Sequence, residues 1–185
     1  MDPVSLPITT ARLTLRLYTD SDLADFAAMY ARPDVVRYLY EEPFTAEEAL
    51  AALQRKAGRT AITADGGALT LVVVRTEDGA YLGDVSLWVT DGPNRGAEVG
   101  FVLHPDHHGH GYGREATRAL LDLAFGPVGL HRVVGQCDAR NAASAKLMTS
   151  LGMRREAEFV RNEYVKGEWT DGLVFALLED EWPQR

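Results

Sequence analysis

A helix joins two short apolar strands in the middle of this chain, and no other stretch constrains the fold as strongly. The first strand covers residues 98–103 and stops before Pro105, and the second covers residues 133–138. The helix starts at Gly111, and its apolar residues recur on one face: Ala116, Leu120, Leu123 and Ala124. Because a helical crossover returns the chain in the same direction, the two strands are expected to be parallel neighbours.

The other segments predict antiparallel strands and three further helices. Strands are expected at residues 12–17, 69–75, 81–89, 156–165 and 169–178, with Glu77-Asp78-Gly79 as a hairpin turn. Capping-box pairs, Thr19 with Asp22 and Thr45 with Glu48, open two of the helices.

The ends and the buried faces of these helices can also be predicted. The first helix should end at Pro33, and the second should bury Leu50, Leu53 and Ala57. The third helix is expected from Asn141, its N-cap, to Leu151, with Gly152 as its C-cap. The order of elements predicts an α/β (α+β) fold, a mixed and mostly antiparallel sheet with helices on both faces, formed by residues 1–185 as one domain.

Charge and composition exclude several classes of function. Lys and Arg number 19 against 27 Asp and Glu, a net charge of −8, which argues against a nucleic-acid partner and suits a cationic substrate. No apolar run approaches the roughly 18 residues that cross a bilayer, and no lipidation signal or basic amphipathic helix is present. The first residues lack the pattern of a signal peptide, so we expect a cytoplasmic protein without a membrane partner. If it associates, a homodimer is the commonest assembly.

Glycine occupies every second position of the loop that precedes the crossover helix, His108-Gly109-His110-Gly111-Tyr112-Gly113-Arg114. Without side chains, the backbone can approach a ligand and expose its N–H groups. At a helix N-terminus such donors attract anions, and Arg114 adds a positive charge. The loop lacks the Lys-Ser/Thr of a P-loop, and Arg114 stands where a dinucleotide-binding motif needs its third glycine. A diphosphate-binding loop is the favoured interpretation, and a flexible turn is the alternative.

This loop resembles motif A of the GCN5-related N-acetyltransferases, Q/R-x-x-G-x-G/A. The segment from Asn141 to Ser144, followed by Leu151-Gly152-Met153, is similar to the N-x-x-S/A…LGF segment of that family. The tail, from Arg155 to Asp171, resembles the RimJ/RimL branch, and the likeness runs from Arg12 to Trp182. The resemblance implies the family's fold and acetyl-CoA as the acyl donor, with no metal.

The resemblance also implies which residues bind acetyl-CoA. The pyrophosphate would be held by the loop, that is by His108, Gly109, His110, Gly111, Tyr112, Gly113 and Arg114. A backbone N–H among Val102, Leu103 and His104 would polarise the thioester carbonyl. Asn141 and Ser144 would contact the pantetheine arm. His108 replaces the usual Gln or Arg, which affects the side-chain contact but not the backbone cradle.

Two residues are candidates for acid–base catalysis. Glu98, at the start of the strand that leads to motif A, is the expected general base, with a solvated strand-edge carboxylate as the alternative. Many relatives carry a tyrosine that protonates the leaving thiolate, but Met148 stands at that position. The Rim-type branch uses a serine, so Ser144 is the expected general acid; a small helix residue without a catalytic role is the alternative.

Other side chains suggest rival chemistry. His104, His107, His108 and His110 lie within seven residues and could bind zinc, but four ligands on a glycine-rich loop would displace the anion cradle. Cys137 is the single cysteine, and we interpret it as a packed side chain rather than a nucleophile.

The expected reaction is acetyl transfer to a primary amine. An α-amine needs less help from a base than a lysine because its reference pKa is about 7.7–8.0 rather than about 10.4. A protein N-terminal α-amine is therefore the leading acceptor. A small-molecule acetyltransferase acting on an antibiotic, polyamine or amino acid is the first alternative, and a non-catalytic acyl-CoA sensor is the second.

Overall fold

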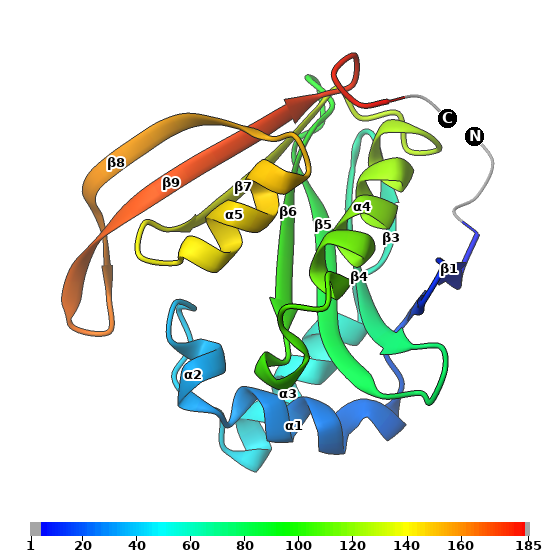
Figure 1. Ribbon diagram of the computed structural model, residues 1–185, viewed down its shortest axis with the longest axis vertical. Coiled ribbons are helices and arrows are strands. Elements are labelled where there is room, and N and C mark those ends of the chain that lie inside the picture. The colour runs from blue at the N-terminus through cyan, green and yellow to red at the C-terminus, as the bar shows by residue number, and fades with distance from the viewer. Residues whose placement is uncertain (1–4, 184–185) are drawn as a thin grey trace.

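The computed structural model describes residues 5–183 and contains one twisted sheet with helices on both faces (Figure 1). The strands lie in the order β1-β2-β4-β5-β6-β7-β9-β8, and β3 pairs with β4. Their bounds are β1 Ile8–Thr9, β2 Leu13–Arg16, β3 Thr60–Thr63, β4 Gly66–Arg75, β5 Tyr81–Asp91, β6 Gly96–Leu103, β7 Arg132–Asp138, β8 Arg154–Val165 and β9 Glu168–Leu178. Only β6 and β7 pair in parallel among the described strands, which confirms the predicted mixed sheet and its crossover.

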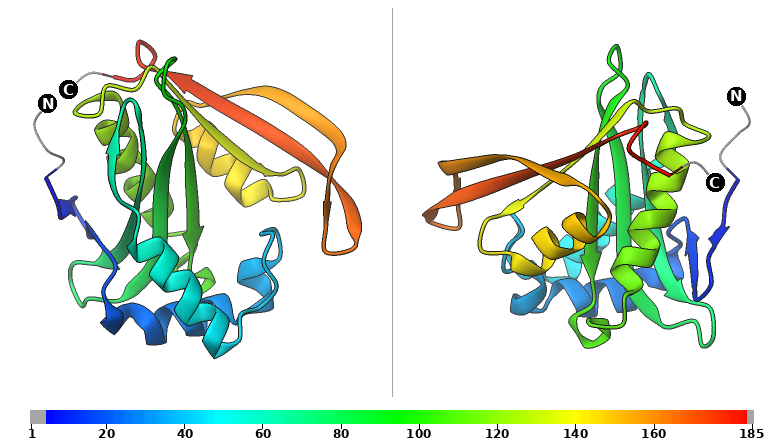
Figure 2. Two further views of the ribbon diagram at one scale, coloured as in Figure 1. Left: turned by 180° about the vertical axis from the view of Figure 1, so that it is seen from behind. Right: turned by 45° about the horizontal axis from the view of Figure 1, so that its top comes forward.

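Within residues 5–183, five α-helices accompany the sheet: α1 Leu23–Tyr30, α2 Pro33–Val36, α3 Ala46–Ala57, α4 Tyr112–Phe125 and α5 Ala142–Ser150. Figure 2 shows α4 and α5 on one face, and α1 and α3 across the other. The two layers bury alternate residues of the same strand. On β4, Leu71 and Val73 pack with Leu120 of α4, whereas Val72 packs with Phe26 of α1.

Most of the predicted helix signals are confirmed. Thr45 accepts a hydrogen bond from the Glu48 N–H, and Glu48 accepts one from the Thr45 N–H. Asp22 likewise accepts a hydrogen bond from the Thr19 N–H at 2.8 Å, opening a 3₁₀ turn, Asp20–Asp22, ahead of α1. Gly152 has φ +89° and lies one position beyond the C-cap of α5, Leu151.

Two helix predictions were wrong. Leu53 is buried and Ala57 partly buried as predicted, but Leu50 is 42% exposed, and Ala49 and Ala52 complete the buried face of α3. Pro33 does not end α1, which stops at Tyr30. It begins α2, at a position where its missing N–H costs nothing. The strands β1 and β3 were not predicted because two and four residues are too few to show a period.

The parallel strands separate soon after they meet. Gly96 to Glu98 of β6 pair with Arg132 to Val134 of β7, and beyond that point β7 continues beside β9 while β6 continues beside β5. The resulting opening lies next to the N-terminus of α4 (Figure 1). On the other side of the molecule, the long β8–β9 hairpin reaches α2, where Lys166 Nζ donates to the Val36 carbonyl at 2.7 Å. Among residues 5–183, no helix has the length and apolar character that a membrane crossing needs.

Candidate active site

The loop before α4 presents backbone N–H groups beside the opening between β6 and β7. Gly109 and Gly111 both have φ +80°, a conformation that favours glycine, and Gly111 is the N-cap of α4. The first intrahelical bond runs from the Glu115 N–H to the Gly111 carbonyl, so the N–H groups of residues 112–114 have no partner within the helix. These donors and the positive end of the helix dipole fit the diphosphate of coenzyme A.

The third glycine of the loop has a different physical reason. A Cβ on Gly113 would lie 2.8 Å from Leu147 Cδ1, so its absence lets α4 pack against α5. Arg114 is exposed, and its Nε donates to the Ser150 carbonyl at 3.1 Å, which fixes its charge beside the loop.

Two histidine rings of the loop, those of His108 and His110, form hydrogen bonds with backbone carbonyls. His108 Nε2 lies 3.0 Å from the Leu103 carbonyl, and His110 Nδ1 lies 2.9 Å from the His108 carbonyl. The ring of His110 also stacks on Tyr112, with centroids 5.7 Å apart. Among the described residues, no three His, Cys, Asp or Glu side chains are arranged to hold a metal.

Of the three backbone N–H groups expected to polarise the thioester carbonyl, only one points to the opening between β6 and β7. The His104 N–H already donates to the Leu82 carbonyl of β5 at 2.9 Å, so the expectation for His104 was wrong. Because N–H groups alternate sides along an antiparallel strand, that of Val102 also points to β5 and that of Leu103 to the opening.

A cleft of about 600 Å³ is lined by residues of β5, β6, β7 and α5, and both predicted catalytic residues line it. Glu98 comes from β6 and Ser144 from the first turn of α5. Asn141, also at the cleft, accepts a hydrogen bond from the Ser144 N–H at 3.1 Å, which confirms it as the helix cap. The structure thus brings the candidate base and acid to one cavity, although their sequence positions lie far apart.

Burial is the main cause of the raised pKa of Glu98. A hydrogen bond from Gln136 Nε2 to Glu98 Oε2, at 3.1 Å, works against that rise, and the negative charge of Glu163 adds to it. A carboxylate with a raised pKa in a cleft is the usual form of a general base.

Two side chains are excluded from the chemistry by their surroundings. Burial and the neighbouring charge of Asp138 raise the pKa of Cys137 to about 11, so little thiolate forms near neutral pH. Met148 is 1% exposed and packs in the core, so it takes no part in proton transfer.

A polar cluster lies at the far end of the cleft around Asp84, an acid that sequence reasoning offers as a candidate for the cleft but without its partners. The carboxylate of Asp84 is buried, and it accepts hydrogen bonds from the Tyr18 hydroxyl at 2.9 Å and the Tyr30 hydroxyl at 3.0 Å. Lys56 Nζ lies 2.6 Å from the other carboxylate oxygen. No motif marks Tyr18, Tyr30 or Lys56, whereas Asp84 stands out as an aspartate inside an otherwise apolar strand pattern.

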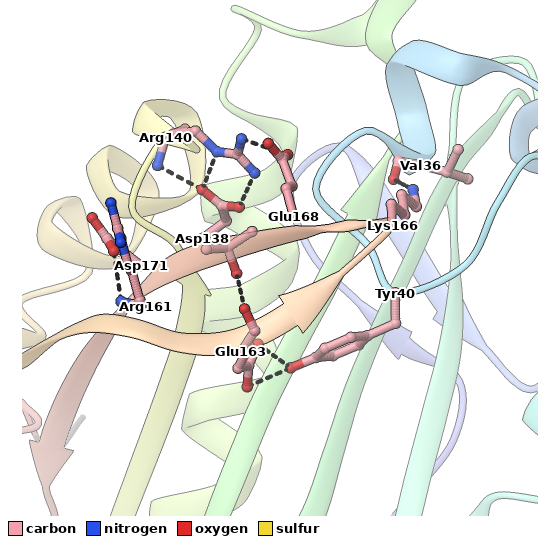
Figure 3. A network of polar contacts seen from close by, with 10 residues as sticks. Val36, Tyr40, Asp138, Arg140, Arg161, Glu163, Lys166, Glu168 and Asp171 are labelled. Carbon is pink, nitrogen blue, oxygen red and sulfur yellow. Dashed lines mark hydrogen bonds and ion pairs between the residues drawn. The ribbon is translucent and has the colours of Figure 1, made fainter.

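A second network, also missed, forms the wall of the cleft at the β8–β9 hairpin (Figure 3). The Tyr40 hydroxyl donates to Glu163, and burial together with Glu163 raises the pKa of Tyr40 to about 12. Arg140 bridges the carboxylates of Asp138 and Glu168, at 2.7 Å in each case. The Tyr40 contact joins the segment after α2 to the hairpin, and the Arg140 contacts join the end of β7 to it.

A sheet that opens between two parallel strands, beside a helix N-terminus with unpartnered N–H groups, is the arrangement expected of a coenzyme A-dependent N-acetyltransferase. Comparison with known proteins agrees. Residues 12–154 match the model of the acetyltransferase (GNAT) domain, and the chain belongs to that family.

Relatives match along nearly the whole chain. The uncharacterized N-acetyltransferase YnaD of Bacillus subtilis is 32% identical over 178 residues, covering 95% of this chain and 98% of YnaD. The crystal structure of a GNAT-family acetyltransferase from Bacillus anthracis is 27% identical, with a TM-score of 0.86 over 95% of this chain and 100% of that chain. The spermidine N(1)-acetyltransferase of Vibrio cholerae is 23% identical over 175 residues, covering 95% of this chain and 98% of the relative.

Proposed function

We propose that this enzyme transfers an acetyl group from acetyl-CoA to a primary amine of a small molecule bound in the cleft, with Glu98 as general base and Ser144 as general acid. The observation that carries the proposal is that both side chains line one cavity beside the opening between β6 and β7. The glycine loop and Arg114 provide the matching diphosphate site on the opening's other side.

Acetyl-CoA supplies an activated acyl group, and the chain's residues move the protons. The neutral amine nitrogen bonds to the acyl carbon as the carbon–sulfur bond breaks. Glu98 accepts a proton from the amine, directly or through a water, and Ser144 donates one to the departing thiolate. The Leu103 N–H is the donor we assign to the carbonyl oxygen, because the His104 N–H is already bonded to Leu82.

Contacts across the cleft favour a small acceptor over a protein N-terminus. Lys166 is bonded to the Val36 carbonyl, and Tyr40 is bonded to Glu163, so the hairpin and the α2 segment meet at this end. A long peptide running through the cleft would have to break both contacts. A small molecule would not, and the spermidine acetyltransferase among the relatives acts on an acceptor of that size.

The test is a free-thiol release assay with acetyl-CoA and a panel of acceptors: amino acids, polyamines, aminoglycosides and peptides with ribosomal-protein N-termini. Turnover confined to small amines supports the proposal. Turnover confined to peptides would move the assignment to protein N-termini. Tight binding of acetyl-CoA without turnover of any amine would favour the acyl-CoA sensor, and a preference for propionyl- or succinyl-CoA would change the acyl group.

A further inference from the structure

We propose that the acceptor carries a carboxylate as well as its amine, and that Arg55 and Arg59, at the C-terminal end of α3, bind this carboxylate. The inference rests on the proposed function and names the substrate class of the same cleft. Its basis is the uneven distribution of charge over the cleft walls.

Cations predominate on one wall of the cleft and carboxylates on the other, although Glu41 lies near α2 and Arg140 and Lys166 lie on the hairpin side. The wall formed by α2 and α3 carries basic side chains: Arg37, Arg55, Lys56 and Arg59. The wall formed by β6, β7 and the β8–β9 hairpin carries acidic ones: Glu98, Asp138, Glu163, Glu168 and Asp171. A ligand with an ammonium at one end and an anion at the other complements both walls, whereas a polyamine complements only one.

Within the described part of the chain, two carboxylates of the hairpin wall form ion pairs, whereas two of the arginines on the α3 wall form none. Arg140 pairs with Asp138 and Glu168. In contrast, neither Arg55 nor Arg59 forms an ion pair within residues 5–183, and both are exposed to the cleft. These two guanidinium groups are therefore free to bind a carboxylate with two parallel hydrogen bonds.

Asp84 does not offset this positive wall. Its carboxylate is already bonded to Lys56 and to the hydroxyls of Tyr18 and Tyr30. A second ammonium at this end of the cleft would have to compete with Lys56 for a buried and fully bonded carboxylate. The cluster thus disfavours a diamine here.

The floor of the cleft is formed by paired residues of β5 and β6. Glu98 pairs with Trp88 across β5 and β6, and Val102 pairs with Asp84. These two rows are four residues apart, or about 13 Å at the usual strand rise. Between them lie Gly100 and Ser86, and the Trp88 ring lies against Gly100, where a Cβ would be 3.1 Å from Trp88 Cζ3.

Arg59 is held beside this floor. Its carbonyl accepts a hydrogen bond from the Thr70 N–H at 2.8 Å, and Thr70 pairs with Ser86, which pairs with Gly100. A cation in the last turn of a helix is stabilised by the helix dipole, and this effect alone can explain the position of Arg55. Arg59 lies beyond the C-cap, Gly58, so the dipole does not explain its place.

The experiment compares acceptors that differ only in the carboxylate: δ-aminovalerate, its carboxamide and cadaverine, and L-methionine beside L-methioninamide. We expect kcat/KM for the best acid to exceed that of its amide by about tenfold or more. The amide has the lower amine pKa and offers more neutral amine, so a preference for the acid runs against intrinsic reactivity. The preference should shrink as salt is added.

Variants locate the effect. Arg59→Gln and Arg55→Gln should each reduce the acid-to-amide ratio, because only the acid carries the charge that these guanidinium groups bind. Arg155→Gln is the matched control: this exposed arginine on β8 pairs with Glu158 and lies outside the cleft. Calorimetric titration of the acid into the protein without acetyl-CoA gives a second readout, and binding should weaken in the cleft variants only.

The outcomes separate this inference from the proposed function. Turnover of amides or cadaverine as fast as the acids, with an unchanged ratio in the arginine variants, overturns the inference and leaves the acetyltransferase assignment intact. If no amine is acetylated, the proposed function fails; absence of acid binding in the titration would then overturn the carboxylate site as well.

Discussion

Arg12, the residue before β2, is bonded to Glu115 in the first turn of α4, 103 positions away in sequence. Arg12 Nε lies 2.7 Å from Glu115 Oε2, and the Arg12 N–H donates to Glu115 Oε1 at 2.9 Å. Although burial opposes ionisation, hydrogen bonds from Thr10 and Arg12 hold the pKa of Glu115 below its usual range. Arg12 Nη1 also donates to the His110 carbonyl at 2.9 Å, and its guanidinium lies 4.6 Å from the Tyr112 ring centroid. Arg12 therefore fixes the shape of the diphosphate loop.

Replacing Arg12 should weaken binding of acetyl-CoA rather than the chemical step. In Arg12→Gln the loop loses its tie to Glu115 and to the His110 carbonyl, so we expect KM for acetyl-CoA to rise about tenfold with kcat within about twofold. Initial-rate kinetics and direct titration with coenzyme A measure both effects. Arg155→Gln serves as the control, and a fall in kcat with unchanged affinity would contradict the positioning role.

Glu98→Gln should reduce turnover by about 10²–10⁴-fold if this side chain is the general base. The substitution keeps the size of the side chain and its place beside Gln136, while removing the ability to accept a proton. Affinity for coenzyme A should not change, since none of the diphosphate-loop residues 108–114 lines the cleft that holds Glu98. A loss below about threefold would show that Glu98 is only a cleft carboxylate.

The neighbours of Glu98 should move its pKa in opposite directions. Burial holds this pKa above the usual value near 4.3, so the ionised base, and activity with it, is lost as pH falls through the raised value. Glu163→Gln removes a like charge and should lower the pKa, whereas Gln136→Leu removes a hydrogen bond to the ionised form and should raise it. Carbon-13 NMR titration of glutamate carboxyls, assigned with Glu98→Gln, measures both shifts. Movement in the same direction would contradict these causes.

Ser144→Ala tests the proposed general acid. We expect kcat to fall by about tenfold or more, because Met148 at the tyrosine position of many relatives cannot protonate the thiolate. The Asn141 cap bonds to the backbone of Ser144 and survives the change, so unfolding should be unaffected. Unchanged kcat would remove Ser144 from the mechanism.

The parts of the molecule that could be predicted are those whose residues are contiguous. The crossover from β6 through the glycine loop and α4 to β7 carries its strand pattern, its helix period and its anion-binding loop in one segment, and each signal is local. The site assembled from distant elements gave no such signal. The hydroxyl of Tyr18 lies 66 positions from Asp84, and Gln136 lies 38 from Glu98, so only the register of the sheet brings these pairs together.

Local patterns also failed where two physical reasons compete. Leu50 has the spacing of a buried residue, but the face of α3 toward the sheet is fixed by the packing of Ala49, Ala52 and Leu53. Gly113 looked like part of a ligand cradle, yet its contact with Leu147 is a requirement of helix packing. Only the three-dimensional arrangement distinguishes such cases.

The pair formed by Lys56 and Asp84 gives a prediction on stability. The side chain of Asp84 is 2% exposed and that of Lys56 is 19% exposed, so Lys56→Met leaves a buried carboxylate without its cation. We expect the free energy of unfolding to fall by about 2–4 kcal/mol, somewhat less than for a fully buried pair because water reaches Lys56.

The double variant Lys56→Met with Asp84→Asn should recover part of this loss. A neutral amide can still accept hydrogen bonds from the hydroxyls of Tyr18 and Tyr30, and it carries no charge that needs the ammonium. Urea unfolding of both single variants and the double variant measures the coupling, with Lys146→Met, an exposed lysine on α5, as the control. If the losses of the two single variants simply add, the carboxylate does not depend on Lys56, and the cluster is held by the tyrosines alone.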